Sequence, residues 1–415
     1  MRKTLSTALL VLGLVVLATG AQAARQDNDG FLYGTVVTDS GKEYTGFLRW
    51  NADEEAFWDD LFHSAKTKLP YIDEVDRADR RRDRKKHTNI KIFGFRVNVE
   101  SDDWAGDDSR VFIARFGDIE RITVKGDDAA RLDMKGGESL DVEGYANDVG
   151  ATILVKDAGL GEIELHWDNI DTIRFAAAPR GADPGEQRLY GKLETRIGSF
   201  EGFIQWDKEE CLASDRLDGE TEDGELSIPM GSIARIERHG SQGCEVTLKD
   251  GRDYRLRGSN DVNDDNRGIM VEDKRYGRVV IYWDEFDRLD FEDRKDSGRG
   301  YDDYKGQKPL SGTVVGKDGE KHRGRIVFDL DESANWEMLN GNWRDAEYNI
   351  PFALVARIEP GRDESRVLLR GGEELWLEDS QDVTENNDGL LIFDQGDADP
   401  LYLRWQQIES IEFGD

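Results

Sequence analysis

One nine-residue phrase occurs three times in this chain and constrains its fold more than any other feature. It reads WDNIDTIRF at 167–175, WDEFDRLDF at 283–291 and WQQIESIEF at 405–413. Matching segments open before these closings: LYGTVVTDSGKEYTGFLRWN from Leu32, LYGKLETRIGSFEGFIQWD from Leu189 and LSGTVVGKDGEKHRGRIVFD from Leu310. The sequence therefore predicts three tandem repeat units, at residues 32–175, 189–291 and 310–413.

We name these segments unit 1, unit 2 and unit 3. Each is long enough to fold alone, because a typical domain has about a hundred residues. The connectors at 176–188 and 292–309 are rich in Ala, Pro, Gly or charged residues, as linkers tend to be. Unit 1 is longer than the others because of an insertion at about 63–108.

The pattern inside each unit is typical of strands, because β-branched and aromatic residues alternate with polar ones between Gly and Asp turns. Both halves of a unit end in two apolar residues three positions apart, as at Ile170 and Ile173. That spacing fits a tight 3₁₀-like turn that leads into a strand with the same face inward. We expect the three tryptophans of the phrase to fill the cores, and the NDV and QDV turns, such as 260–262, to be structural. These tryptophans are Trp167, Trp283 and Trp405.

The first half of each unit opens on the pattern V-x-x-D-x-G-K-E-Y-x-G-F-L-x-W-(N/D), seen around Gly41, Gly46 and Trp50. This pattern resembles the opening of Sm-like and SH3-like small β-barrels. The resemblance implies an all-β fold of three units, each a pair of five-stranded SH3/Sm-like barrels, with a short helical insertion in unit 1. SH3-like domains of bacterial envelopes commonly bind peptides or cell-wall material. The RNA binding common among Sm-like proteins is not expected of an acidic, exported chain.

The first residues have the composition of a secretory signal peptide. Arg2 and Lys3 precede an apolar stretch from Leu5 to Leu17, and Ala21-Gln22-Ala23 forms an A-x-A cleavage site. We therefore expect residues 1–23 to be removed near Ala23/Ala24, which predicts a periplasmic or secreted protein. The apolar stretch is too short to span a bilayer comfortably, and no membrane span is expected elsewhere.

The charge of the chain restricts its partners. It has 88 acidic and 56 basic side chains, a formal net charge of −32 at pH 7, and loss of Arg2 and Lys3 makes this two units more negative. Such a charge keeps a protein soluble and repels nucleic acid, so no nucleic-acid partner is expected. Cations and basic partners are compatible with it.

The sequence contains no recognisable catalytic motif. Its five histidines fall at unrelated positions of the repeats, and HExxH, CxxC, GxSxG and phosphate-loop motifs are missing. Carboxylates are so plentiful that proximity alone cannot nominate an acid–base pair. We therefore expect no catalytic residue, and keep an enzyme of unknown class as a distant alternative.

The acidic loop after the second strand of each unit is the first candidate site. It reads WNADEEAFWDDL, WDKEECLASDRL and FDLDESANWEML in the three units. Side-chain oxygens at such spacing can surround Ca²⁺, which takes about six to eight hard ligands, whereas the alternative is a solvated turn with Asx caps. The calcium candidates are Asn51, Asp53 and Glu54 in unit 1, Asp207, Glu209 and Glu210 in unit 2, and Asp329, Asp331, Glu332 and Glu337 in unit 3.

The insertion of unit 1 contains the second candidate site, a basic cluster in a mixed-charge helix expected near 73–86. Such a cluster can grip an acidic partner or lipid head groups. The alternative is a solvated helix whose cations pair with Asp76, Asp79 and Asp83. The candidates for partner binding are Arg80, Arg81, Arg82, Arg84, Lys85 and Lys86.

Cys211 and Cys244 are the two cysteines of the chain, and both lie in unit 2. In an oxidising compartment we expect a disulfide bond between them, the alternative being two separate buried thiols.

These features favour a non-catalytic envelope protein whose barrel modules serve as a scaffold for an unidentified envelope protein or glycan. The alternative is a calcium-binding structural or sensor protein that uses the acidic loops. The residues themselves do not specify an oligomeric state.

Overall fold

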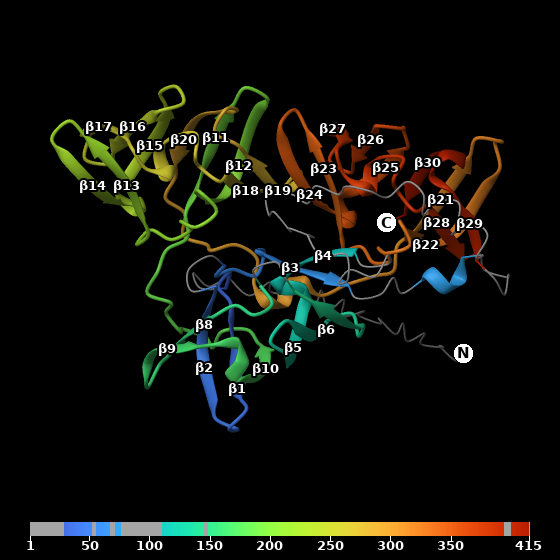
Figure 1. Ribbon diagram of the computed structural model, residues 1–415, viewed down its shortest axis with the longest axis horizontal. Helices are drawn as coiled ribbons and strands as arrows, with labels where there is room; N and C mark the ends of the chain where they lie inside the picture. Colours follow the sequence, from blue (N-terminus) through green and yellow to red (C-terminus); the bar gives the residue numbers. More distant parts are fainter. Residues whose placement is uncertain are drawn as a thin grey trace, which may run out of the picture.

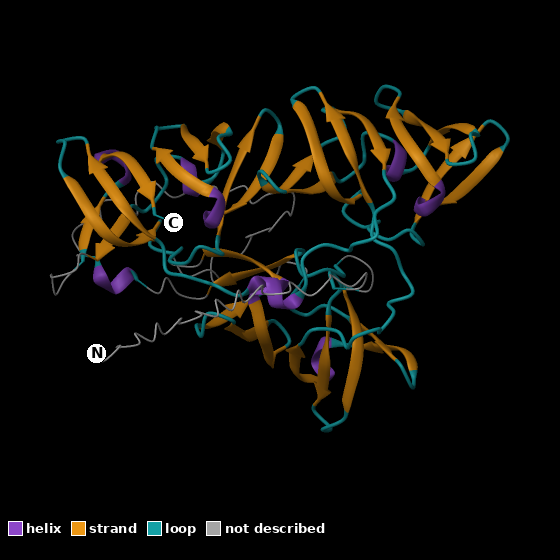
Figure 2. Cartoon of the chain, turned by 180° about the vertical axis from the view of Figure 1, so that it is seen from behind, coloured by secondary structure: helices purple, strands orange, loops and turns teal. Residues whose placement is uncertain are grey.

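The computed structural model describes residues 29–51, 55–66, 71–75, 110–144, 148–393 and 400–414. Over these residues the protein is all-β, as expected: antiparallel strands are joined by tight turns and by 3₁₀ helices of three or four residues (Figure 1, Figure 2). Within the described residues, no helix is long and apolar enough to cross a membrane. The predicted signal peptide lies outside these residues, as does the predicted helix near 73–86 beyond residue 75.

Unit 1 forms a sheet of ten strands in the spatial order β4-β3-β7-β6-β5-β10-β1-β2-β8-β9. The strands are β1 Tyr33–Thr38, β2 Glu43–Trp50, β3 Leu61–Lys66, β4 Arg110–Arg115, β5 Ile119–Gly126, β6 Ala129–Met134, β7 Ser139–Glu143, β8 Ile153–Asp157, β9 Gly161–Leu165 and β10 Ile170–Phe175. The 3₁₀ helices are η1 Ile72–Glu74, η2 Phe116–Asp118 and η3 Trp167–Asn169.

Units 2 and 3 share one sheet of twenty strands. Unit 2 contains β11 Tyr190–Thr195, β12 Gly198–Gln205, β13 Arg216–Thr221, β14 Gly224–Pro229, η4 Met230–Ser232, β15 Ile233–Arg238, β16 Gly243–Leu248, β17 Asp253–Arg257, η5 Asn260–Val262, β18 Ile269–Asp273, β19 Gly277–Ile281 and β20 Phe286–Phe291, and η6 Tyr301–Tyr304 follows in the connector. Unit 3 contains β21 Ser311–Gly316, β22 Lys321–Phe328, β23 Met338–Trp343, β24 Ala346–Pro351, η7 Phe352–Leu354, β25 Val355–Glu359, β26 Glu364–Leu369, β27 Glu374–Glu378, η8 Gln381–Val383, β28 Leu390–Phe393, β29 Leu401–Leu403, η9 Trp405–Gln407 and β30 Ile408–Phe413.

The same strand pairings recur along the chain. The first strand of each unit pairs with the second and with the last: β1 with β2 and β10, β11 with β12 and β20, and β21 with β22 and β30. Glycines in the second strand permit a close approach of another strand, since a Cβ on Gly46 or Gly202 would lie 2.0 Å from a carbonyl oxygen. This explains why the opening pattern keeps a glycine at that position.

The repeated phrase forms a corner that closes each core. Trp167 and Trp405 each begin a 3₁₀ helix and Trp283 begins a turn, and all three are buried, with at most 3% of their surface exposed. Each indole N–H donates to a backbone carbonyl, Trp167 to Gly126, Trp283 to Gly240 and Trp405 to Gly361. The ring therefore packs in the core while its one polar group is satisfied by the turn after β5, β15 or β25.

The units meet in two different ways. Units 2 and 3 are joined through their backbones, because β19 pairs with β24 and one hydrophobic core runs through both units. Unit 1 lies below the row that units 2 and 3 form (Figure 1), and its core includes Ala334 and Trp336 of unit 3. It contacts the row through small apolar clusters, one of which joins Phe31, Ala56 and Phe57 to Cys211 and Leu212.

Candidate functional site

The acidic loops that connect β2 to β3, β12 to β13 and β22 to β23 begin in the same way. Each begins with a residue in the left-handed region, Asn51, Asp207 or Asp329, with φ near 50° (49°, 50° and 49°). Asn and Asp tolerate this region better than most side chains, which explains their occurrence here. The loop then returns toward its first strand, as the bridge pairs Trp50–Glu55, Trp206–Glu210 and Phe328–Glu332 show.

One carboxylate near the end of each loop holds the loop closed. Asp60 accepts hydrogen bonds from the backbone N–H groups of Ala56 and Phe57, both at 2.9 Å. Asp215 accepts the equivalent bonds from residues 211 and 212 at 2.9 and 2.8 Å, and Glu337 those from residues 333 and 334 at 2.6 and 2.9 Å. We call Asp60, Asp215 and Glu337 the loop carboxylates.

Each loop carboxylate also binds a cation that belongs to another unit. Asp60 pairs with Arg278 of unit 2 at 2.9 Å, and Glu337 pairs with Lys66 of unit 1 at 3.0 Å. Asp215 pairs with Arg49 of unit 1 at 3.3 Å. The acidic loops therefore lie at the contacts between units, and their carboxylates have both a local and a long-range partner.

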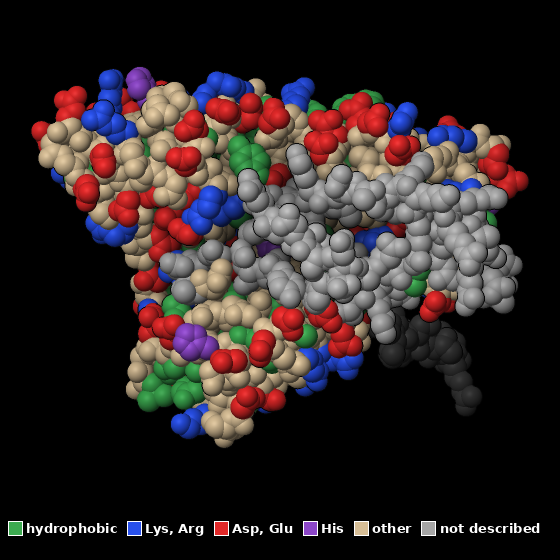
Figure 3. Space-filling model, viewed as in Figure 1, with side chains coloured by type: hydrophobic (Ala, Val, Ile, Leu, Met, Phe, Trp, Pro, Cys, Tyr) green, Lys and Arg blue, Asp and Glu red, His purple; other side chains and the backbone are tan. Residues whose placement is uncertain are grey.

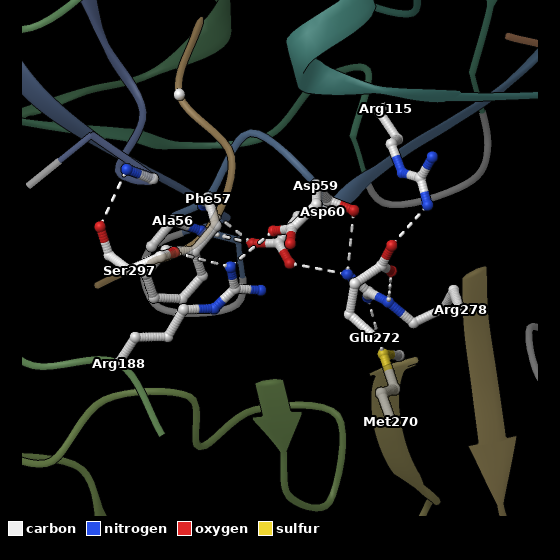
Figure 4. Close-up of polar contacts among 12 residues, drawn as sticks. Ala56, Phe57, Asp59, Asp60, Arg115, Arg188, Met270, Glu272, Arg278 and Ser297 are labelled. Carbon is white, nitrogen blue, oxygen red and sulfur yellow. Dashed lines mark hydrogen bonds and ion pairs between the residues drawn. The ribbon is translucent and has the colours of Figure 1, made fainter. Parts of the chain in front are cut away.

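The contact between units 1 and 2 is a network of buried ion pairs (Figure 4). Asp59, next to Asp60, pairs with Arg188 at 2.7 Å, and the guanidinium of Arg188 also lies 3.9 Å from the ring centre of Phe57. Arg278 pairs with Glu272 as well as with Asp60, and Glu272 in turn binds Arg115 of unit 1. The side chains of all these ions are at most 14% exposed. Three carboxylates thus meet three guanidinium groups, so the charge of this contact is balanced.

The contact between units 1 and 3 involves β3 and β4. Lys66, at the end of β3, binds Asp331 at 2.5 Å and Glu337 at 3.0 Å. Arg110, at the start of β4, pairs with Asp388. Burial alone would lower the pKa of Lys66, but the neighbouring carboxylates Asp331 and Glu337 outweigh it and raise that pKa above its ordinary value. Lys66 therefore stays charged at any physiological pH.

Buried carboxylates in the loops, and one in the QDV turn of unit 3, have raised pKa values. Burial and the nearby Asp261 raise the pKa of Glu210 to about 9. Burial and Asp331 raise the pKa of Glu332 well above its ordinary range, and burial raises the pKa of Asp382 to about 7. In both Glu210 and Glu332 the Oε2 atom is buried without a hydrogen-bond partner. Glu210 therefore carries a proton at neutral pH.

Several of the predicted calcium ligands have protein partners in this structure. Asp329 accepts hydrogen bonds from Gln381 and from the backbone of Asp388, while Asp331 and Glu337 bind Lys66. In unit 2, Asp207 and Glu209 pair with Arg267 at 3.0 and 2.7 Å. Within the described ranges, no three His, Cys, Asp or Glu side chains are grouped to hold a metal ion. Asp53 and Glu54 lie outside the described residues.

The other sequence-based expectations have mixed outcomes. The disulfide prediction is wrong for this structure: Cys211 and Cys244 are not bonded to each other, and they lie in two different hydrophobic clusters. Cys211 packs at the contact with unit 1, and Cys244 packs in the core of unit 2. The basic cluster at 80–86 lies outside the described residues. The NDV and QDV turns are structural as expected, since Asp261 and Asp382 accept backbone hydrogen bonds at 2.7 Å.

The cations of the unit contacts were missed by the sequence reasoning. Lys66, Arg110 and Arg115 lie on β3 and β4, where the insertion of unit 1 begins and ends, and they carry no motif. One signal was present in the repeat itself: unit 2 has Arg267 where unit 3 has Asp388 and unit 1 has Ala151. Such a change of charge at one repeat position indicates that the ion pairing there differs between the units.

Comparisons of this chain with protein-family models, with curated proteins and with solved structures found no match.

Proposed function

We propose that this protein is a non-catalytic, exported scaffold whose modules bind a protein or glycan of the cell envelope. In this proposal each unit is a pair of small SH3/Sm-like barrels, which the recurring pairing of first, second and last strands supports. The observation that carries the proposal is that the three loop carboxylates bind cations of other units. The loop carboxylates thus help to fix the arrangement of the modules, as a scaffold requires.

The outer surface supports the same proposal. Many acidic and basic side chains are dispersed over the face shown in Figure 3, and the described residues include just four large hydrophobic side chains that are well exposed. They are Leu160, Leu368, Trp376 and Leu401. A surface of this kind suits a polar partner more than a large apolar one.

The test is a binding measurement with the intact chain. Purified protein is incubated with sedimentable cell-wall glycan and, separately, with envelope proteins under cross-linking conditions. We expect saturable binding to one of the two, without chemical change of the bound material. The matched variant Arg278→Met, which loosens the contact between units 1 and 2, is expected to bind more weakly while its units stay folded. Absence of saturable binding to both, or turnover of the glycan, would contradict the proposal.

The second candidate is a calcium-binding structural or sensor protein. It is favoured by the buried Oε2 atoms of Glu210 and Glu332, which have no hydrogen-bond partner and face other carboxylates. A melting curve with millimolar Ca²⁺, against the same concentration of Mg²⁺, tests it. A shift specific to Ca²⁺ that disappears in Glu332→Gln supports calcium binding, and identical curves for the two ions exclude it.

A further inference from the structure

One pair of equivalent positions carries a different combination of charges in each of the three units. The pair consists of the first residue of the acidic loop and the residue that faces it. In unit 2 these are Asp207 and Arg267, which form an ion pair within the unit at 3.0 Å. In unit 1 both residues are uncharged, Asn51 and Ala151. In unit 3 both residues are acidic, because Asp388 replaces the arginine and faces Asp329.

Unit 3 therefore lacks, at this position, the arginine that unit 2 has. Asp329 is 2% exposed, and two neighbouring carboxylates in such a place repel each other and lose hydration. The missing guanidinium comes from unit 1, because Arg110 binds Asp388 and lies close enough to Asp329 to interact with its charge. Arg110 thus takes the place that Arg267 fills inside unit 2.

The unit 1 side of this contact is equally specific. Lys66 and Arg110 are direct partners in the register of β3 and β4, so two positive charges lie opposite each other on neighbouring strands. Such a pair destabilises an isolated pair of strands. It is stabilised here because Asp331, Glu337 and Asp388 of unit 3 surround the two cations. Figure 1 shows β3 and β4 on the side of unit 1 that faces units 2 and 3.

We propose that unit 3 carries a receptor site for two cations on adjacent strands, and that β3 and β4 of unit 1 occupy it as an internal ligand. The partner that fits the site is a basic strand or hairpin of another polypeptide, which displaces β3 and β4. The inference rests on the proposed scaffold function and specifies one binding surface for it. The contact is suited to exchange because, among the described residues, no strand of unit 1 pairs with a strand of unit 3, whereas units 2 and 3 are joined by paired strands.

The probe for this site is a cyclised peptide that carries the sequences of β3 and β4 joined by an Asn-Gly turn. Its affinity is measured by isothermal titration against the full-length chain and against the variant Lys66→Ala, Arg110→Ala. The variant has lost its internal cations, so its site is open more often and its apparent Kd should be at least about tenfold lower. A control peptide with both basic residues replaced by alanine should bind at least about tenfold more weakly.

Adding Asp388→Arg to the open variant should abolish binding of the basic peptide, because the new guanidinium satisfies Asp329 as Arg267 satisfies Asp207. If the open variant does not fold, Arg110→Gln, which keeps both ion pairs of Lys66, answers the same question. Equal affinities for both peptides, or for wild type and variant, would overturn the inference. If this happens while the intact chain still binds envelope material, the scaffold function stands and only the receptor site is refuted.

Discussion

The tryptophan of the repeated phrase is buried in each unit, and Trp283 is the clearest example. It is 2% exposed, packs against Trp206 and Phe286, and donates to the carbonyl of Gly240 at 2.9 Å. Trp283→Ala should lower the free energy of unfolding by ~3–5 kcal/mol, because a large aromatic is lost from a core. Urea denaturation followed by circular dichroism measures this. The exposed Trp376 is the control, and an equal loss in Trp376→Ala would contradict the assignment.

Glu210 gives the protein an unusual dependence on pH. Its folded-state pKa is about 9, above the ordinary value near 4.5, so the folded state holds a proton that the unfolded state releases. Its contribution to stability is therefore lost as the pH rises between these two values, by up to about 1.4 kcal/mol per pH unit. Thermal melts of Glu210→Gln should depend less on pH over this range than those of wild type. Glu209→Gln, at a position 41% exposed, should behave like wild type.

The residues of the acidic loops illustrate how far the sequence could be interpreted. An alignment without gaps from Trp50, Trp206 and Phe328 places Asp59 opposite Asp215 and Glu337, yet the loop carboxylate of unit 1 is Asp60. The reason is that the loop of unit 1 is one residue longer: the bridge joins Trp50 to Glu55, whereas it joins Trp206 to Glu210. A one-residue bulge in a loop leaves no mark on the strand pattern, so only the backbone hydrogen bonds reveal it.

Equivalent strands of the three units differ in whether they pair with a strand of another unit. The side chains that point away from the core of their own unit explain this difference. β19 of unit 2 has Val280 at a position where β9 of unit 1 has Glu164 and β29 of unit 3 has Tyr402. Val280 is 3% exposed and pairs with Glu347 of β24, whereas Glu164 is exposed and β9 pairs with β8 alone among the described strands. Charged residues on an edge strand prevent further pairing, so the valine permits the joint between units 2 and 3.

Val280→Glu should therefore open this joint. The new carboxylate would lie opposite Glu347, and burial of a second charge there costs several kcal/mol. We expect calorimetry to resolve two unfolding transitions where wild type has one for units 2 and 3. The reciprocal change Glu164→Val serves as the control, since it alters an edge that joins no other unit and should leave these transitions unchanged. A single transition in Val280→Glu would show that the shared core alone holds the two units together.

Across the whole molecule, the buried ions of Figure 4 hold unit 1 in place. Arg278→Met would leave Asp60 and Glu272 buried without their shared cation, at a cost of ~3–5 kcal/mol. We expect unit 1 to unfold or detach first, which limited proteolysis in the connector 176–188 would detect. Arg235→Met, which removes an exposed ion pair with Asp290, should cost less than about 1 kcal/mol. Equal protection from protease in both variants would argue against a structural role of the network.

The arrangement of the units could not have been predicted from the sequence, although strand content could. Alternating side chains and turn residues specify strands locally, and they did so throughout the described residues. The placement of unit 1 depends instead on pairs such as Arg115 with Glu272 and Arg278 with Asp60, whose members are far apart in the chain. In a chain with 56 basic and 88 acidic side chains, charge alone allows too many pairings for any one of them to be selected.

The connector 292–309 makes contacts with unit 1 that cannot form until the ribosome has synthesised most of the chain. Ser297 receives the backbone N–H of Gly30, and the ring of Tyr304 is buried against Gly117, where a Cβ atom would lie only 2.5 Å from it. A ribosome releases residues 30 and 117 long before residue 304. Unit 1 thus emerges first yet lacks these two contacts until most of the chain has followed, which leaves it prone to aggregation in the interval. A chain truncated after unit 2, before Ser297 and Tyr304, should therefore be degraded sooner than the full-length chain, although it contains all residues of units 1 and 2.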